Sequence, residues 1–221
     1  MELFRDKIYR SPRTRSNLIY QHFVDVFGTE IRRVINVSGW NDQDKNGRTY
    51  QSYFKSVQLT SYDVSNKGGY RGNIADNQLL INLEDRKFSP TKTYDLVFCH
   101  TVLEHVFDVF NAARILCELT DRFVFCVVPH VQEIHGTKDF GDYWRFNPDG
   151  IQTLFLNNEI KASTTLFAHA RGSSSYLCLI GSKDPDDQDR LDQVFFKNRE
   201  PKFVSNNFLY VLNSVCKKLK G

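Results

Sequence analysis

Residues 94–99 (YDLVFC) decide the fold class of this chain. They form a near-continuous apolar run of strand length, as expected for a strand that is buried on both faces of a sheet. A second run of this kind covers 122–128 (RFVFCVV), and a helical pattern over 108–119 lies between the two. Two buried strands joined by a helix are typical of a parallel sheet wrapped by helices.

The rest of the chain extends this alternation in both directions. Residues 171–174 (RGSS) lie between the last two predicted strands and are typical of a hairpin connection. We therefore predict an α/β fold with a mostly parallel seven-stranded sheet that ends in an antiparallel strand pair, and with helices on both faces. The other predicted strands are 33–37, 57–63, 70–76, 160–168 and 175–181, and the other predicted helices are 16–28 with Ser16 as N-cap, 49–55, one that begins at Asn147-Pro148, and 203–219.

Composition limits the function classes. The 221 residues fit one domain, and 41% hydrophobic with 25% charged residues is an ordinary globular balance. The net charge of +3 is too small to indicate nucleic-acid binding by itself. The most basic stretch, residues 5–15, is interpreted as a solvated arm, with contact to an anionic substrate as the alternative.

The cysteines and the apolar runs bear on the compartment. The five cysteines are an odd number, and no two of them have the C-x-x-C spacing. Unpaired cysteines in apolar runs behave as small hydrophobic residues and suit a reducing environment. No apolar run approaches the roughly 18 residues of a membrane helix. We expect a cytoplasmic protein without a membrane span.

Polar residues follow the predicted strands, and in open α/β sheets ligands bind beyond the carboxyl ends of the strands. These residues therefore predict a site at one edge of the sheet. They are Ser38, Gly39 and Trp40 after the first strand, Asp63 after the second, Asp76 and Asn77 after the third, Cys99, His100 and Glu104 after the fourth, and His130, His135 and 141–146 after the fifth.

Two segments resemble a known family. Residues 94–106 (YDLVFCHTVLEHV) resemble the fourth-strand segment of class I S-adenosylmethionine-dependent methyltransferases, which often reads YDLV followed by LEHV. Residues 142–151 (DYWRFNPDGI) resemble the DYWRFTPxGL block of a subgroup often found near surface-glycan biosynthesis. The resemblance implies a single-domain Rossmann-like methyltransferase fold over 1–182, with 183–221 as a helical extension packed on the same domain.

The first strand departs from the family pattern of an acid followed by a glycine-rich turn. Asn36 stands in place of the acid, Ser38 in place of the first glycine, and Trp40 in place of a later one. Glycines let the backbone approach a cofactor closely, so this turn is degenerate. A methyltransferase-like domain that has lost catalysis and serves as a binding or scaffold domain is therefore the main alternative.

The resemblance implies S-adenosylmethionine as the cofactor and assigns residues to its parts. From the residues alone, Asp63 and Asp76 have an alternative interpretation as strand-end turn residues. The implied contacts are Ser38, Gly39 and Trp40 with Cys99 and His100 on the methionine side, Asp63 on the ribose hydroxyls, and Asp76 with Asn77 at the adenine.

The implied acceptor pocket consists of His100, Glu104, His135, Tyr143 and Arg145. A histidine that titrates near neutrality suits a general base, so His100 and His135 are the catalytic candidates. Arg145 is interpreted either as part of a buried ion pair or as a grip on an anionic acceptor. We expect Tyr143 to pack in the core or a lid more readily than to touch an acceptor, and the ring of His105 to bond local backbone.

These observations favour methyl transfer to a small molecule, and the second block suggests a sugar or nucleotide-linked sugar used in surface polysaccharide assembly. A protein or nucleic-acid methyltransferase that uses the basic arm is a further alternative. Cys126, His130 and His135 match no usual zinc spacing, so we expect no metal. The 203–219 helix is expected to pack on its own domain, with a homodimer contact as the alternative.

Overall fold

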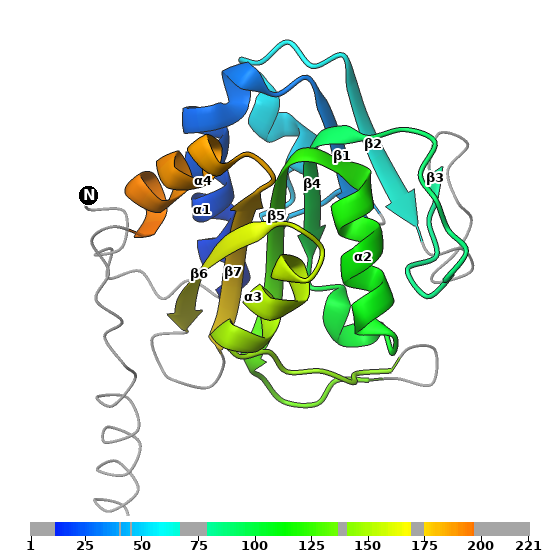
Figure 1. Cartoon of the computed structure of the whole chain (residues 1–221). Coiled ribbons are helices and arrows are strands. Elements are labelled where there is room, and N and C mark those ends of the chain that lie inside the picture. The colour runs from blue at the N-terminus through cyan, green and yellow to red at the C-terminus, as the bar shows by residue number, and fades with distance from the viewer. Residues whose placement is uncertain are drawn as a thin grey trace, which may run out of the picture.

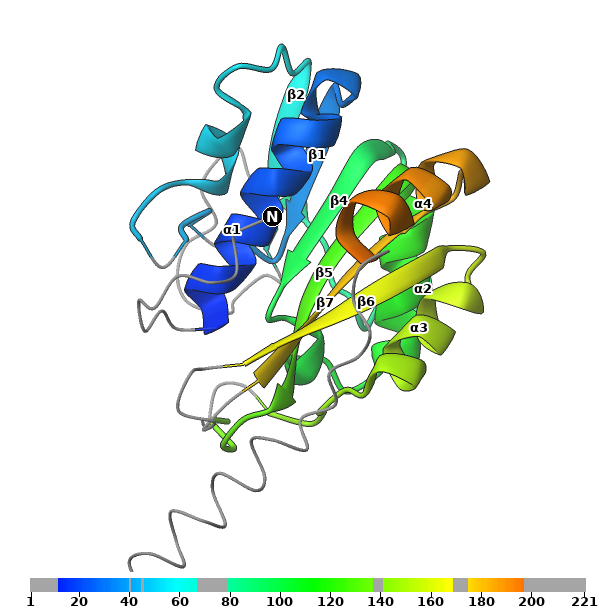
Figure 2. The same cartoon turned by 90° about the vertical axis from the view of Figure 1, so that its left-hand side faces the viewer.

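A seven-stranded sheet runs through the centre of the computed structural model, and helices cover both of its faces (Figures 1 and 2). The structure describes residues 12–39, 41–44, 46–66, 79–136, 141–168 and 175–196. The strands are β1 (Arg33–Val37), β2 (Ser61–Asn66), β3 (Leu79–Leu80), β4 (Tyr94–His100), β5 (Thr120–Val131), β6 (Lys161–Ala168) and β7 (Ser175–Ser182), and the α-helices are α1 (Pro12–Phe27), α2 (Val109–Leu119), α3 (Pro148–Leu156) and α4 (Pro185–Leu191).

The order of the strands confirms the predicted sheet. It reads β3-β2-β1-β4-β5-β7-β6, so the chain first builds outward from β1 and then crosses back to β4. β1 pairs in parallel with β2 and β4, and β4 pairs in parallel with β5. β7 runs antiparallel to both of its neighbours. The carboxyl ends of β1, β2, β4 and β5 therefore meet at one edge of the sheet.

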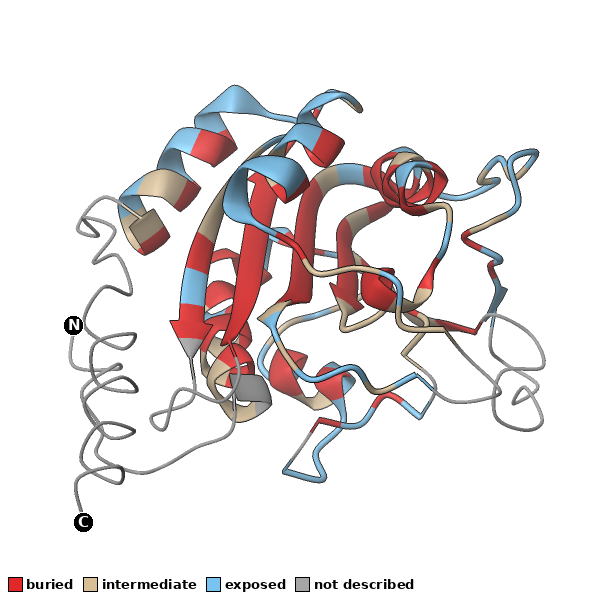
Figure 3. Ribbon diagram, turned by 90° about the horizontal axis from the view of Figure 1, so that it is seen from below, coloured by how far each residue is buried: buried red, intermediate tan, exposed pale blue. Residues whose placement is uncertain are grey.

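The two faces of the sheet have different chemistry. Alternate residues along a strand point to opposite faces, so Val97 packs with α2 and α3 while Phe98 packs with α1. The α2/α3 side is mostly aliphatic. The α1 side is rich in aromatic rings, and in Figure 3 the buried residues concentrate on the central strands between the two layers. The fully buried rings of the α1 side are Tyr20, Phe23, Phe27, Phe98, Phe123 and Phe125.

Two predicted boundaries were wrong. The first helix begins at Pro12, where proline lacks only an N–H that a first turn would leave unpaired, and Ser16 is a buried residue inside the helix instead of its N-cap. The second strand covers Ser61–Asn66 and not 57–63. The predicted strand at 70–76 and the hairpin residues 171–174 lie outside the described residues.

The other helix ends follow from the sequence. The side chain of Asp108 caps α2 by accepting from Asn111 N, and Asn147 caps α3 by accepting from Gly150 N. After β7, α4 and a π turn (Asp192–Phe196) pack with Leu191 and Phe195 against the aromatic layer. The predicted helix at 203–219 and its dimer contact lie outside the described residues. Within the described ranges, no helix is both long and apolar enough to cross a membrane.

Candidate functional site

The turn after β1 has the backbone of a glycine-rich loop but carries side chains. Ser38 has φ 55° and Asp42 has φ 56°, both in the left-handed region that favours glycine. A Cβ on Gly39 would lie 2.4 Å from the side chain of Asn36, so only glycine fits there. Of Ser38, Gly39 and Asp42, only Gly39 keeps the close approach of backbone to the strand end that a glycine-rich loop provides.

A buried acid, Asp42, lies beside Asn36 at the end of β1. The Nδ2 of Asn36 donates to Asp42 Oδ1 at 2.7 Å, and the hydroxyl of Tyr62 donates to the same oxygen at 2.7 Å. The backbone N–H of Gln51 donates to Oδ2 at 3.0 Å. Burial above all, with further contributions from Tyr20 and the Asp42 carboxylate, holds the pKa of Tyr62 well above its usual range. Sequence reasoning missed Asp42, although an acid six residues after Asn36 was the available signal.

Asp63, which was expected to contact the ribose, does not lie at the carboxyl end of β2. Asp63 is the third residue of β2, level with Ile35, and does not follow the strand as predicted. Its carboxylate pairs with Lys92 Nζ at 2.7 Å, and Lys92 precedes the amino end of β4. Asn66 instead holds the carboxyl end of β2, because the strand ends three residues later than the apolar pattern indicated. In the turn, Ser38 N donates to Ser65 Oγ at 3.0 Å.

The end of β4 separates two residues that were expected together. Cys99 is 0% exposed and packs in the aliphatic layer. Its side chain therefore does not line the edge of the sheet, contrary to the prediction. His100 points to the other face, where its Nε2 lies 2.7 Å from Ser16 Oγ and its ring 5.9 Å from that of Tyr50. Thr101 follows with φ 53°, which turns the chain sharply at the strand end.

The carboxyl edge of β4 and β5 brings together Glu104, His105 and His135. One ligand atom of each residue lies within 4.8 Å of the others. The Glu104 side chain is 0% exposed, and its Oε1 lies 3.8 Å from His105 Nε2. The rings of His105 and His135 meet edge to face at 4.9 Å. His105 does bond backbone as expected, but through the distant Gly141 carbonyl at 2.7 Å.

The guanidinium of Arg145 uses its hydrogen-bond donors within the protein. It forms a two-pronged ion pair with Asp142, with both N–O distances 2.6 Å, and this hydrogen bonding lowers the pKa of Asp142 to about 2. The remaining donors bond the carbonyls of Gln132, Glu133 and Trp144. All five N–H donors of the guanidinium are thus used. Of the two expectations for Arg145, the geometry favours the ion pair over the anion grip.

Tyr143 lies at the surface and not in the core. Its side chain is 51% exposed, and its ring is 5.4 Å from that of Phe107, which is 67% exposed. Tyr143 N donates to the Glu104 carbonyl at 2.7 Å, and Trp144 Nε1 donates to the Val106 carbonyl at 2.9 Å. The segment after β5 is therefore tied to the segment after β4, with an aromatic pair facing solvent.

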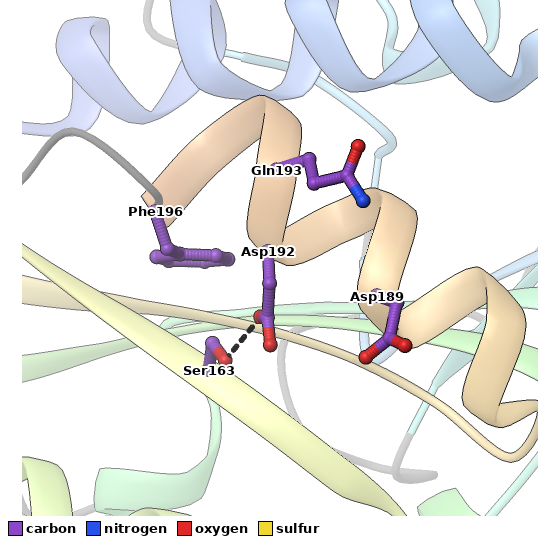
Figure 4. A pocket seen from close by; sticks show the side chains of 5 residues that line it. All are labelled: Ser163, Asp189, Asp192, Gln193 and Phe196. Atoms are coloured by element: carbon purple, nitrogen blue, oxygen red, sulfur yellow. Dashed lines mark hydrogen bonds between the residues drawn. The ribbon is translucent and has the colours of Figure 1, made fainter.

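Other expected site residues fall elsewhere. Trp40, Asp76 and Asn77 lie outside the described residues. A pocket of about 500 Å³ lies between α4, the π turn and edge strand β6, where Ser163 Oγ donates to Asp192 at 2.6 Å (Figure 4). This pocket is not at the carboxyl edge of β1, β4 and β5, and it contains none of the expected residues.

Comparisons with known proteins bear on the fold. No protein-family model and no curated protein sequence matches the chain. Magnesium protoporphyrin IX methyltransferase from Synechocystis PCC 6803, solved with bound S-adenosylmethionine, matches with a TM-score of 0.50 at 13% identity, over 78% of this chain and 79% of that chain. The chain has a Rossmann-like methyltransferase fold.

Two further solved structures match the same fold. The YcgJ protein from Bacillus subtilis matches with a TM-score of 0.51 at 10% identity, over 74% of this chain and 98% of that chain. An O-methyltransferase family protein from Burkholderia thailandensis matches with a TM-score of 0.50 at 14% identity, over 77% of this chain and 59% of that chain. At such identities the likeness concerns the fold and not the substrate.

Proposed function

We propose that this chain transfers a methyl group from S-adenosylmethionine to a small-molecule acceptor. The observation that carries the proposal is the sheet order with an antiparallel seventh strand, combined with a left-handed turn directly after β1. Ligands of open α/β sheets bind at such a switch point, where the strand order reverses between β1 and β4. The solved methyltransferases of the same fold support this assignment.

The residues at the edge fit such a cofactor. The methionine part of S-adenosylmethionine carries a sulfonium and an ammonium, and the buried carboxylate of Asp42 supplies the opposite charge beside them. Its Oδ2 accepts one hydrogen bond among the described residues, which leaves that oxygen room for another donor. Gly39 admits close backbone approach, and Asn66 offers an amide to the ribose hydroxyls. When bound, the cofactor supplies the methyl group as an electrophile.

The acceptor would lie beside Phe107 and Tyr143. Exposed aromatic rings that meet at an angle suit a flat or ring-shaped acceptor, such as a sugar. The resemblance to the subgroup near surface-glycan biosynthesis directs the first screen to sugars and nucleotide-linked sugars. Arg145 does not support the choice of an anionic acceptor, because all of its donors are engaged.

His100 is our choice for the proton acceptor. Its ring is oriented by Ser16 and Thr101, at 2.7 and 3.3 Å, and it stands at the end of β4 next to the β1 turn. A hydroxyl or amine acceptor loses a proton during methyl transfer, and a nearby imidazole can take it. Alignment and exclusion of water would supply much of the remaining acceleration.

Calorimetric titration with S-adenosylmethionine and S-adenosylhomocysteine tests the proposal. We expect micromolar binding that weakens at least about tenfold in Asp42→Asn, which removes one charge and keeps the shape. Asp63→Asn is the matched control, because its carboxylate pairs with Lys92 away from the edge, and it should bind normally. Circular dichroism of both variants checks that they are folded.

The alternatives give different results. No binding of either ligand by the folded chain at millimolar concentration would overturn the enzyme and favour a binding or scaffold domain, as the side chains of Ser38 and Asp42 in glycine-like positions would allow. Salt-sensitive retention on heparin or RNA, lost when residues 1–11 are removed, would favour a macromolecular acceptor over a small molecule.

A further inference from the structure

Two adjacent side chains and a third from a distant part of the sequence converge beside β4 and β5. Glu104 and His105 belong to a 3₁₀ turn (Leu103–His105) after β4, and His135 lies in the segment after β5. Their nearest ligand atoms lie within 4.8 Å of one another. In a loaded site with metal–ligand bonds of about 2.1 Å, these atoms would be roughly 3.0–3.5 Å apart, so small side-chain rotations would close the site.

Hydrogen bonds orient both imidazoles for metal binding. His105 Nδ1 lies 2.7 Å from the carbonyl oxygen of Gly141, which can only accept, so this nitrogen carries the proton. His135 Nδ1 lies 3.2 Å from Asp142 Oδ2 and 3.2 Å from the Glu133 carbonyl, which are also acceptors only. In the neutral rings the lone pair then resides on Nε2 of each histidine. Metal-binding histidines typically have their second nitrogen held in this way.

A rigid outer layer fixes the second of these rings. His135 N donates to Asp142 Oδ2 at 2.8 Å, and the same carboxylate is gripped from its other side by Arg145. The Asp142 side chain is 1% exposed. A carboxylate that orients a histidine, and is itself oriented by an arginine, is an arrangement found around metal ligands. The interaction also explains why Arg145 has no donor for a substrate.

Charge and burial favour a cation at the point of convergence. The Glu104 side chain is 0% exposed, so its carboxylate is buried. The side chains of His105 and His135 are 15% and 30% exposed, so solvent reaches the cluster from the histidines. A buried carboxylate is stabilised by pairing or by metal coordination. Two imidazoles and one carboxylate form a known ligand set for zinc and other first-row divalent metals.

We propose that Glu104, His105 and His135 form a binding site for a divalent transition-metal ion, with Asp142 and Arg145 as its outer layer. Three protein ligands leave a coordination position open, as in catalytic rather than purely structural metal sites. The cluster lies at the same edge of the sheet as the proposed methyl transfer. The metal site does not depend on that activity.

The test is zinc binding to the full chain after treatment with a chelator and dialysis. Calorimetry should give one zinc ion per chain with micromolar or tighter affinity. Glu104→Gln and His135→Gln, which keep the size of the side chain or nearly so, should each weaken binding at least about 100-fold, and Asp142→Asn about 10–100-fold. His130→Gln is the control, because its Nδ1 also bonds a carbonyl, that of Phe146 at 2.6 Å, and it should bind normally.

Cobalt(II) gives a second measurement on the unmodified chain. The visible spectrum should show nitrogen and oxygen ligands, without the intense near-ultraviolet band of a thiolate ligand. The proposal is overturned if the folded chain takes up no zinc at millimolar concentration. It is also overturned if Glu104→Gln and His135→Gln bind zinc as the unmodified chain does, or if the cobalt spectrum shows thiolate ligation. Circular dichroism confirms that the variants fold.

Discussion

The side-chain amide of Asn36 donates a hydrogen bond to Asp42 at 2.7 Å, so the acid of this edge comes from the loop and not from β1. Both residues are buried, with 2% and 8% exposure. An amide and a carboxylate are complementary, whereas two carboxylates at this distance cannot both be ionised without a large cost. Asn36 and Asp42 therefore form a complementary amide–carboxylate pair that joins the strand end to the loop.

Placing an acid at position 36 should lower the stability of the protein. Asn36→Asp would place two carboxylates in contact, and we expect the free energy of unfolding to fall by about 2 kcal/mol at neutral pH. The loss should shrink near about pH 4, where one carboxyl can be protonated. Denaturant unfolding measures both values. The double variant Asn36→Asp/Asp42→Asn again pairs one amide with one carboxylate, so it should regain most of the stability. Failure to do so would contradict the importance of this complementary pair.

Gly39→Ala should be poorly tolerated. Its new Cβ would lie 2.4 Å from the Asn36 side chain, so the turn or the amide must move, at an expected cost of about 1–3 kcal/mol. Gly150→Ala is the control in the first turn of α3, where the nearest atom is the Asn147 Oδ1 at 3.1 Å. Its effect should stay within about 0.5 kcal/mol. Thermal melts of the two variants compare them directly, and equal melting temperatures would show that the turn adapts.

Glu30 should give the chain an acid-sensitive contribution to stability. Hydrogen bonding from Arg190, against the opposing effect of burial, and then from Arg122 lowers the pKa of Glu30 to about 2. Because the folded pKa lies below the unfolded value of about 4.3, the stabilisation is complete above that value and is lost as the pH falls toward 2. The Glu30 side chain is 34% exposed, so solvent screening limits the effect to about 1 kcal/mol.

Glu30→Gln provides the measurement. The difference in unfolding free energy between the unmodified chain and this variant should be present at neutral pH and should close between about pH 4 and pH 2. A difference that stays constant over this range would mean that the carboxylate is not linked to folding. Asp25→Asn, whose carboxylate bonds Gln21 on exposed helix surface, serves as the control and should show little difference at any pH.

Arg145→Lys should destabilise the segment after β5. Lysine cannot reproduce the two-pronged pair with Asp142 or the bonds to three carbonyls, so we expect a loss of about 2 kcal/mol. Arg86→Lys is the control, since the Arg86 side chain is 81% exposed and pairs with Asp108, and it should change stability by less than about 0.5 kcal/mol. Chemical denaturation distinguishes the two, and equal effects would show that the five bonds of Arg145 add little.

The local pattern of apolar residues was sufficient to predict the central strands of the sheet, but not the bounds of the strands at its margins. Residues 94–99 form a near-continuous apolar run, so β4 was predicted to within one residue of its observed bounds, Tyr94–His100. β2 alternates polar and apolar residues on both sides of Ser61, and only its pairing with β1 fixes where it begins. The error of a few residues moved Asp63 away from the carboxyl edge, since position along the strand decides which end a side chain serves.

The site depended even more on contacts across the chain. His135 was selected from the sequence as a base, but its relation to His105 arises because β4 and β5 are parallel neighbours whose ends meet. No spacing rule joins residues 30 positions apart. Arg145 was correctly placed in an ion pair as one of two expectations, and only the five donor distances decide between them.

One face of the sheet is mostly aliphatic and the other is rich in aromatic rings, and this difference makes Trp144 a local optical probe of the aliphatic side. Tyr20, Tyr50 and Tyr53 all lie in the aromatic layer with α1, whereas Trp144 packs against the aliphatic layer and its N–H and backbone adjoin the segment of Glu104. The chain has two tryptophans, so Trp40→Phe would leave Trp144 as the sole indole emitter. Its fluorescence would then report events at the β4–β5 edge, separately from the aromatic layer that packs against α1.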